Sequence, residues 1–91
     1  MIAYIAGKIT GEKDYKNKFA AAEEQLQKAG FIVLNHASLP EGMSSNKYMP
    51  ICLAMIEASD VVFFLKDWTR SKGALIEHNY SIYQNKKISY L

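Results

Sequence analysis

The feature that most constrains the fold is the apolar segment Val61-Val62-Phe63-Phe64-Leu65, which directly follows Asp60. Side chains alternate between the two faces of a strand, so a strand here is apolar on both faces. Strands of this kind lie in the middle of parallel sheets that helices cover on each side. Parallel neighbours are joined by crossovers that usually contain a helix. The segment therefore predicts an α/β protein with a parallel sheet.

Three further strands and three helices are expected around this central strand. The first helix has the clearest pattern, because Phe19, Ala22, Leu26 and Ala29 recur at spacings of three and four. Gly30 follows at the position of a C-capping glycine. Strands are predicted at residues 2–6, 31–34, 61–65 and 86–90, and helices at about residues 14–29, 49–58 and 72–83.

Two residues indicate where the later helices begin. Pro50 is expected in the first turn of the second helix, where its missing N–H costs nothing. Ser71 is expected to cap the third helix, and the polar segment 37–47 is expected to be a loop. With right-handed crossovers, this order predicts a doubly wound, flavodoxin- or Rossmann-like sheet. Its four parallel strands are expected in the order 2-1-3-4, with helices on both faces.

Length and composition narrow the class of protein. A chain of 91 residues is expected to form one domain over residues 1–91. Its single cysteine excludes an internal disulfide. The longest apolar run, residues 51–56, is far shorter than the ~20 residues of a membrane span, so no membrane partner is expected. No signal peptide is visible before Ile2, and a cytoplasmic location is therefore expected.

Charge and size also bear on partners. The net charge of +2 gives no strong basic footprint, so a nucleic-acid polymer is not an expected partner. A domain this small has a thin margin of stability, and association is a common remedy. A homodimer or higher homo-oligomer is therefore expected.

Ligands of doubly wound sheets bind at the carboxyl ends of the strands, at the switch point between the first and third strands. The loops 7–11 and 66–73 should meet there. The first has glycines that let backbone approach a ligand, and the second ends at a helix N-terminus that favours anions. Both loops are basic, with Lys8, Lys66, Arg70 and Lys72. They suit a phosphate or another small anion; alternatively, they are solvated loops with ordinary caps.

Several functions that rely on short motifs are disfavoured. The chain has no GxxxxGK[ST] segment, no GxGxxG segment and no GxSxG segment, which argues against an NTPase, a dinucleotide enzyme and a serine hydrolase. His36 and His78 are not at metal-ligand spacing with acidic partners, and Cys52, the only cysteine, is expected in the middle of a helix without a companion ligand set. No metal and no cofactor are therefore expected.

Glu77 is the residue with the greatest catalytic promise. It falls near the second turn of the third helix, and helical side chains lean toward the N-terminus, here toward the crevice. Tyr4 on the first strand could bring its hydroxyl to the same place. A carboxylate held by a tyrosine hydroxyl is a plausible nucleophile toward an anomeric carbon. The alternative is an ordinary surface glutamate.

Two segments carry recognisable motifs, Tyr4-Ile5-Ala6-Gly7-Lys8-Ile9-Thr10-Gly11 and Ser71-Lys72-Gly73-Ala74-Leu75-Ile76-Glu77. Together they resemble the nucleoside 2-deoxyribosyltransferase superfamily, most nearly its small phage and bacterial branch. They are also similar to deoxynucleoside monophosphate N-glycosidases. The resemblance implies that Glu77 attacks C1′ of a deoxynucleoside and that Tyr4 orients it. It implies a substrate site made of Gly7, Lys8, Ile9, Thr10, Gly11, His36, Ser71 and Gly73, with His36 near the base.

Position 71 bears on the substrate. Members of the superfamily that act on free nucleosides carry an Asp there, whereas the nucleotide-hydrolysing branch carries a Ser that can donate to a 5′-phosphate. Ser71, with the helix N-terminus and nearby cations, therefore favours a small-molecule partner of the nucleoside 5′-monophosphate type. Either a deoxyribosyltransferase or a nucleotide N-glycosidase is consistent with the resemblance.

Two departures from the superfamily keep other functions open. The active families carry an Asp that protonates the leaving base, eight positions before the residue that matches Asp60, and this sequence has Cys52 there. A thiol in an apolar helix is a poor general acid, so Cys52 is interpreted as a packing residue and Asp60 as a structural carboxylate. The families also continue past the fourth strand, whereas this sequence ends at Leu91. A non-catalytic nucleotide-binding module and a structural domain are the alternatives.

Overall fold

The computed structural model describes all 91 residues and contains one four-stranded parallel sheet. The strands lie in the order β2-β1-β3-β4, which confirms the predicted α/β fold and its strand order. Strand β1 spans Ile2–Ala6, β2 Ile32–Asn35, β3 Val61–Phe64 and β4 Lys87–Tyr90. Every residue of β3 is buried, as its apolar sequence predicts.

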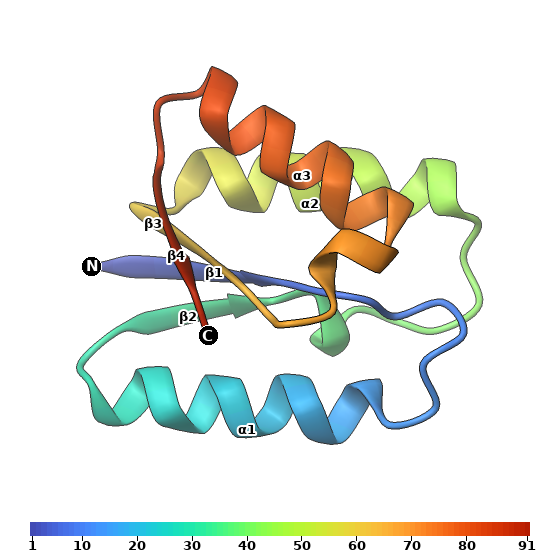
Figure 1. Cartoon of the computed structure of the whole chain (residues 1–91), viewed down its shortest axis with the longest axis horizontal. Coiled ribbons are helices and arrows are strands. Elements are labelled where there is room, and N and C mark those ends of the chain that lie inside the picture. The colour runs from blue at the N-terminus through green and yellow to red at the C-terminus, as the bar shows by residue number, and fades with distance from the viewer.

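Helices cover both faces of this sheet (Figure 1). Helix α1, Tyr15–Lys28, lies on one face, and helices α2, Ser45–Ala58, and α3, Lys72–Tyr83, lie together on the other. Alternate residues of the central strands supply the two cores. Ala3 and Phe63 belong to the α1 side, whereas Tyr4 and Phe64 belong to the side of α2 and α3. Tyr4 is therefore directed toward the helix that carries Glu77.

The main difference from the sequence-based expectation is the start of α2. The helix begins at Ser45 rather than near Met49, because the carbonyl of Ser44 already accepts hydrogen bonds from the backbone N–H groups of Lys47 and Tyr48. Pro50 consequently lies inside the helix and not in its first turn. The predicted loop 37–47 is also shorter. A 3₁₀ turn occupies His36–Ser38, and the last three loop residues, 45–47, belong to α2.

Two backbone details bear on the site. Gly30 adopts a φ of +94°, as predicted for a glycine that follows a helix C-terminus. Gly7 directly follows β1 and lies against Leu65, the residue that directly follows β3. A Cβ added at Gly7 would stand 2.9 Å from Leu65 Cδ1 and 3.0 Å from Leu65 Cβ. Glycine at position 7 therefore allows the loop after β1 to pass close to the loop after β3.

Asp60 has the structural role that the sequence predicts. Its Oδ2 accepts a hydrogen bond from the backbone N–H of Ile2 at 2.8 Å, which joins the start of β1 to the start of β3. It lies at the opposite end of these strands from the loop that begins at Gly7. None of the helices is long and apolar enough to cross a membrane.

Candidate functional site

A cavity of about 530 Å³ lies beyond the carboxyl ends of β1 and β2, between the loop after β1 and the N-terminal parts of α2 and α3. This is the switch point of the sheet, where β1 has β2 on one side and β3 on the other. The structure brings most of the sequence-predicted site residues to this cavity, namely Gly7, Ile9, Thr10, His36, Ser71, Gly73 and Glu77. Lys8 and Gly11 belong to the same loop but do not line the cavity.

Glu77 and Tyr4 meet at the wall of this cavity. The Tyr4 hydroxyl donates a hydrogen bond of 2.5 Å to Glu77 Oε2, although the two residues are 73 positions apart in the sequence. Glu77 is only 3% exposed, so the alternative of an ordinary surface glutamate is wrong. Glu77 is the sixth residue of α3 and lies on the buried face of this helix, together with Ala74 and Ser81. This face is directed toward the sheet. Tyr4 is completely buried in β1.

Burial sets the protonation of this pair. Loss of solvent raises the pKa of Glu77 to about 7, and the hydrogen bonds from Tyr4 and Cys52 oppose the rise. Burial also raises the pKa of Tyr4 well above its ordinary value, with a further contribution from the negative charge of Glu77. Near neutral pH the Glu77 carboxyl therefore exchanges between its acid and its ionised form, while Tyr4 remains a hydrogen-bond donor.

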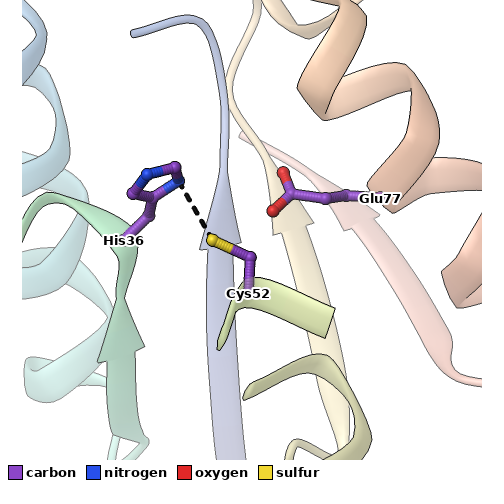
Figure 2. Close-up of side chains that lie close together, drawn as sticks. All are labelled: His36, Cys52 and Glu77. Carbon is purple, nitrogen blue, oxygen red and sulfur yellow. Dashed lines mark hydrogen bonds between the residues drawn. The ribbon is translucent and has the colours of Figure 1, made fainter. Parts of the chain in front are cut away.

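Cys52, interpreted from the sequence as a packing residue, also lines the cavity. It packs in the core with Tyr4 and Ile56, as expected of a packing residue, but its Sγ also lies 3.4 Å from Nδ1 of His36 (Figure 2). Burial raises the pKa of the Cys52 thiol to about 12 and lowers the pKa of His36. The sequence placed Cys52 at the position of the resembled families' proton donor and one helical turn before Ile56, which predicts an inward side chain but not the contact with His36.

The far end of the cavity presents hydrogen-bond donors and positive charge. The Oγ of Ser71 accepts a hydrogen bond of 3.1 Å from the backbone N–H of Ala74, so Ser71 caps α3 as predicted. An N-cap hydroxyl that accepts in this way keeps its own O–H available to donate outward. Arg70 and Lys72, on either side of Ser71, also line the cavity, whereas Lys66 lines a second hollow near α1.

Asp67 positions the loop after β1 and was not singled out from the sequence. Its side chain is buried, and its Oδ1 accepts a hydrogen bond of 3.1 Å from the backbone N–H of Lys8. Its Oδ2 lies 3.7 Å from Nζ of Lys18 on α1. Asp67 therefore links the two loops that border the cavity. It does so by a hydrogen bond to the backbone N–H of Lys8 and not by an ion pair with the Lys8 side chain.

Residues of the first turn of α2 form another missed part of the cavity wall. Ser45, Tyr48 and Met49 line it, together with Met43 just before the helix. Tyr48 fixes this segment, because its hydroxyl donates to the carbonyl of Pro40 and accepts from the N–H of Met43. Its ring also lies 5.4 Å from that of His36. These contacts could not be anticipated while residues 45–47 were expected to be loop.

Comparison with known proteins is consistent with this architecture. No curated protein matches the chain. Among solved structures, a 2-desoxiribosyltransferase from Leishmania mexicana superposes with a TM-score of 0.77 at 14% sequence identity. The match covers 99% of this chain but only 63% of that protein, and at this identity it shows a shared fold. The model of a family described as "Domain of unknown function (DUF4406)" matches residues 1–90, and the chain therefore belongs to that family.

Proposed function

We propose that this protein cleaves the N-glycosidic bond of a deoxynucleoside 5′-monophosphate, with Glu77 as the nucleophile. The observation that carries this proposal is the buried Glu77 carboxyl, held by the Tyr4 hydroxyl at 2.5 Å in the wall of a cavity. A buried carboxylate with one oxygen fixed has its other oxygen available for attack. The shared fold with a 2-desoxiribosyltransferase supports the same class of chemistry.

The reaction has two steps. One oxygen of the Glu77 carboxylate forms a bond to C1′ as the C1′–N bond breaks, and the electron pair of that bond leaves with the base. The base takes up a proton from solvent water, and a covalent deoxyribosyl ester of Glu77 remains. Water or a second base then attacks C1′, loses its proton to solvent and restores the carboxylate, which gives hydrolysis or transfer respectively. Tyr4 acts by orienting the carboxyl, since its raised pKa keeps the hydroxyl protonated.

The 5′-phosphate is proposed to lie against the N-terminus of α3. Ser71 supplies a hydroxyl donor there, while Arg70 and Lys72 supply positive charge. Glu77 lies one and a half turns further along the same helix, so the sugar would span the distance between the phosphate and the nucleophile. His36 lines the cavity just after β2, within 4.8 Å of the Glu77 carboxyl, and the base is proposed to lie beside it. A cavity of about 530 Å³ is within the usual range for a ligand of this size.

Cys52 favours a second candidate function, a nucleotide-binding module without catalysis. The thiol stands where the resembled enzymes carry their proton donor, and burial raises its pKa to about 12. Such a thiol protonates a leaving base poorly. In this case the cavity would bind the nucleotide and leave its glycosidic bond intact.

A base-release screen separates the two candidates. The full chain is incubated with each deoxynucleoside and each deoxynucleoside monophosphate, and free base is measured by chromatography. Release from monophosphates that disappears in Glu77→Gln supports catalysis. A thermal shift with monophosphates but no base release supports the binding module. Release from free deoxynucleosides and not from monophosphates would overturn the assignment of the phosphate site.

We also propose that the chain forms a homo-oligomer through the outer face of α3. Apolar side chains outside the cavity are exposed along this helix, among them Leu75 at 40%, Ile82 at 55% and Tyr83 at 80%. Sedimentation equilibrium tests this directly, because Ile82→Lys and Tyr83→Lys should shift an oligomer toward monomer. A wild-type chain that sediments as a monomer at high concentration would contradict the proposal.

A further inference from the structure

The cavity holds a cluster of three side chains with metal-binding atoms from three different elements. His36 begins the 3₁₀ turn after β2, Cys52 lies in α2 and Glu77 lies in α3. Their ligand atoms all lie within 4.8 Å of one another, and His36 Nδ1 lies 3.4 Å from Cys52 Sγ. Figure 2 shows the imidazole and the carboxylate on either side of the thiol, all three directed toward one region above β1.

We infer that His36, Cys52 and Glu77 form a binding site for a thiophilic divalent cation of the Zn²⁺ class. One nitrogen, one sulfur and one oxygen donor are the ligand types that zinc takes in proteins, whereas Mg²⁺ and Ca²⁺ require oxygen donors. Three protein ligands leave a fourth position of a tetrahedral site open, as in catalytic zinc centres. All three residues line the cavity, so this fourth position would be accessible to a small ligand.

The distances suit such an ion after small side-chain movements. Ligand atoms at typical zinc distances are about 3.5 Å apart in a tetrahedral site. The pair formed by His36 and Cys52 already meets this spacing at 3.4 Å, and the other separations, all within 4.8 Å, need to close by at most about 1 Å. A change of about 1 Å is within the range of side-chain rotation at Glu77 or His36.

The surroundings support metal binding in two further ways. The Tyr4 hydroxyl holds Oε2 of Glu77, which orients the carboxylate as outer hydrogen bonds do for metal ligands and leaves the other oxygen to bind the ion. Cys52 and Glu77 together supply up to two negative charges when ionised, which would balance the charge of the cation. His36 is half-buried and has no carboxylate partner that competes with a metal.

The site was not expected from the sequence, because metal motifs are recognised by ligands at short spacings. Here the three residues are spread over 42 positions, from 36 to 77, and only the fold brings them together. Binding of the cation does not depend on the proposed glycosidic activity. A cation bound to Glu77 would, however, block the attack of Glu77 on C1′. Metal and nucleotide would therefore exclude each other.

Cobalt provides the test, because a cysteine thiolate bound to Co²⁺ gives a charge-transfer band in the near ultraviolet. The full chain is freed of metal with a chelator, exchanged into chelator-free buffer and titrated with Co²⁺ and then with Zn²⁺. Cys52 is the only cysteine, so this band in the wild-type chain identifies its sulfur as a ligand. We expect saturation at one Co²⁺ per chain and displacement of the cobalt by Zn²⁺.

Variants assign the other ligands. Cys52→Ser should abolish the band, and His36→Asn and Glu77→Gln should each weaken Zn²⁺ binding about 100-fold or more by calorimetry, while Tyr4→Phe should weaken it about 10-fold. His78→Gln is the matched control, because His78 lies outside the cavity and pairs with Tyr90. A wild-type chain without the band, or Zn²⁺ binding that persists unchanged in Cys52→Ser, would overturn the inference. Base release measured in chelator tests the glycosidic function separately.

Discussion

The raised pKa of Glu77 should make the free energy of unfolding depend on pH. In the folded protein the pKa of its carboxyl is about 7, against an ordinary value of 4.5. A pKa raised by folding means that the native state binds a proton that the unfolded state releases. The stability from this proton is fully present below about pH 4.5 and is lost as the pH rises through about 7. The linkage relation makes the loss about 2–3 kcal/mol between about pH 5 and about pH 8.

The substitution Glu77→Gln removes this titration while keeping a side chain of the same shape. The glutamine oxygen can still accept the hydrogen bond from Tyr4, so packing at the site is retained. The free energy of unfolding of Glu77→Gln should therefore lack the contribution that the wild-type chain loses between about pH 5 and about pH 8. The stability of the variant relative to wild type should rise by about 2–3 kcal/mol over that range.

Urea unfolding followed by circular dichroism measures this difference. Both proteins are unfolded at several pH values in a chelating buffer, so that no metal ion competes for the site. Glu24→Gln is the control, because Glu24 is an exposed glutamate on α1 that pairs only with Lys28. A difference between wild type and Glu77→Gln that stays constant with pH would refute the reasoning, since Glu77 would then titrate as a solvated carboxyl.

Three further predictions concern activity and the loops around the cavity. Base release should increase with pH through about 7, because the Glu77 nucleophile must be ionised. Tyr4→Phe should shift this midpoint to higher pH, because the hydrogen bond from Tyr4 lowers the pKa of Glu77. A pH–rate profile that is unchanged in Tyr4→Phe would contradict this. Ser71→Asp should keep the cap of α3 and its stability but weaken binding of monophosphates relative to deoxynucleosides by calorimetry, whereas Ser71→Ala should also cost about 1 kcal/mol in unfolding free energy. Gly7→Ala should destabilise the protein by about 1–3 kcal/mol because its Cβ meets Leu65. Gly73→Ala, whose nearest contact is an ordinary 3.7 Å, should not destabilise it in the same thermal unfolding measurement.

The sheet could be predicted from the sequence because its signals are local and strong. An uninterrupted apolar segment at 61–65, helical periodicity at 19–29 and a glycine at position 30 each reflect a backbone or burial requirement of one element. The start of α2 was misjudged because Ser44, Ser45 and Asn46 have the composition of a loop. The same residue types favour helix N-termini, and Ser44 serves as that terminus here.

The site was only partly predictable for a different reason. Tyr4 and Glu77 could be related in advance, because topology alone places the first strand and the third helix at one switch point. The pairing of His36 with Cys52 depends on the exact length of the connection between β2 and α2, which no pattern in the sequence specifies. Asp67 gave no signal either, since a carboxylate in a basic loop has the appearance of a solvated residue until its hydrogen bond to Lys8 is known.

The central claim is that Glu77 attacks C1′ of a deoxynucleotide, and trapping of the covalent intermediate tests it most directly. A 2′-fluoro deoxynucleoside monophosphate slows the second step, so that the glycosyl ester accumulates. Peptide mass spectrometry of the full chain is predicted to find the added sugar phosphate on Glu77, and no adduct in Glu77→Gln. Base release that continues in Glu77→Gln, with no adduct on Glu77 in the wild-type chain, would contradict the account.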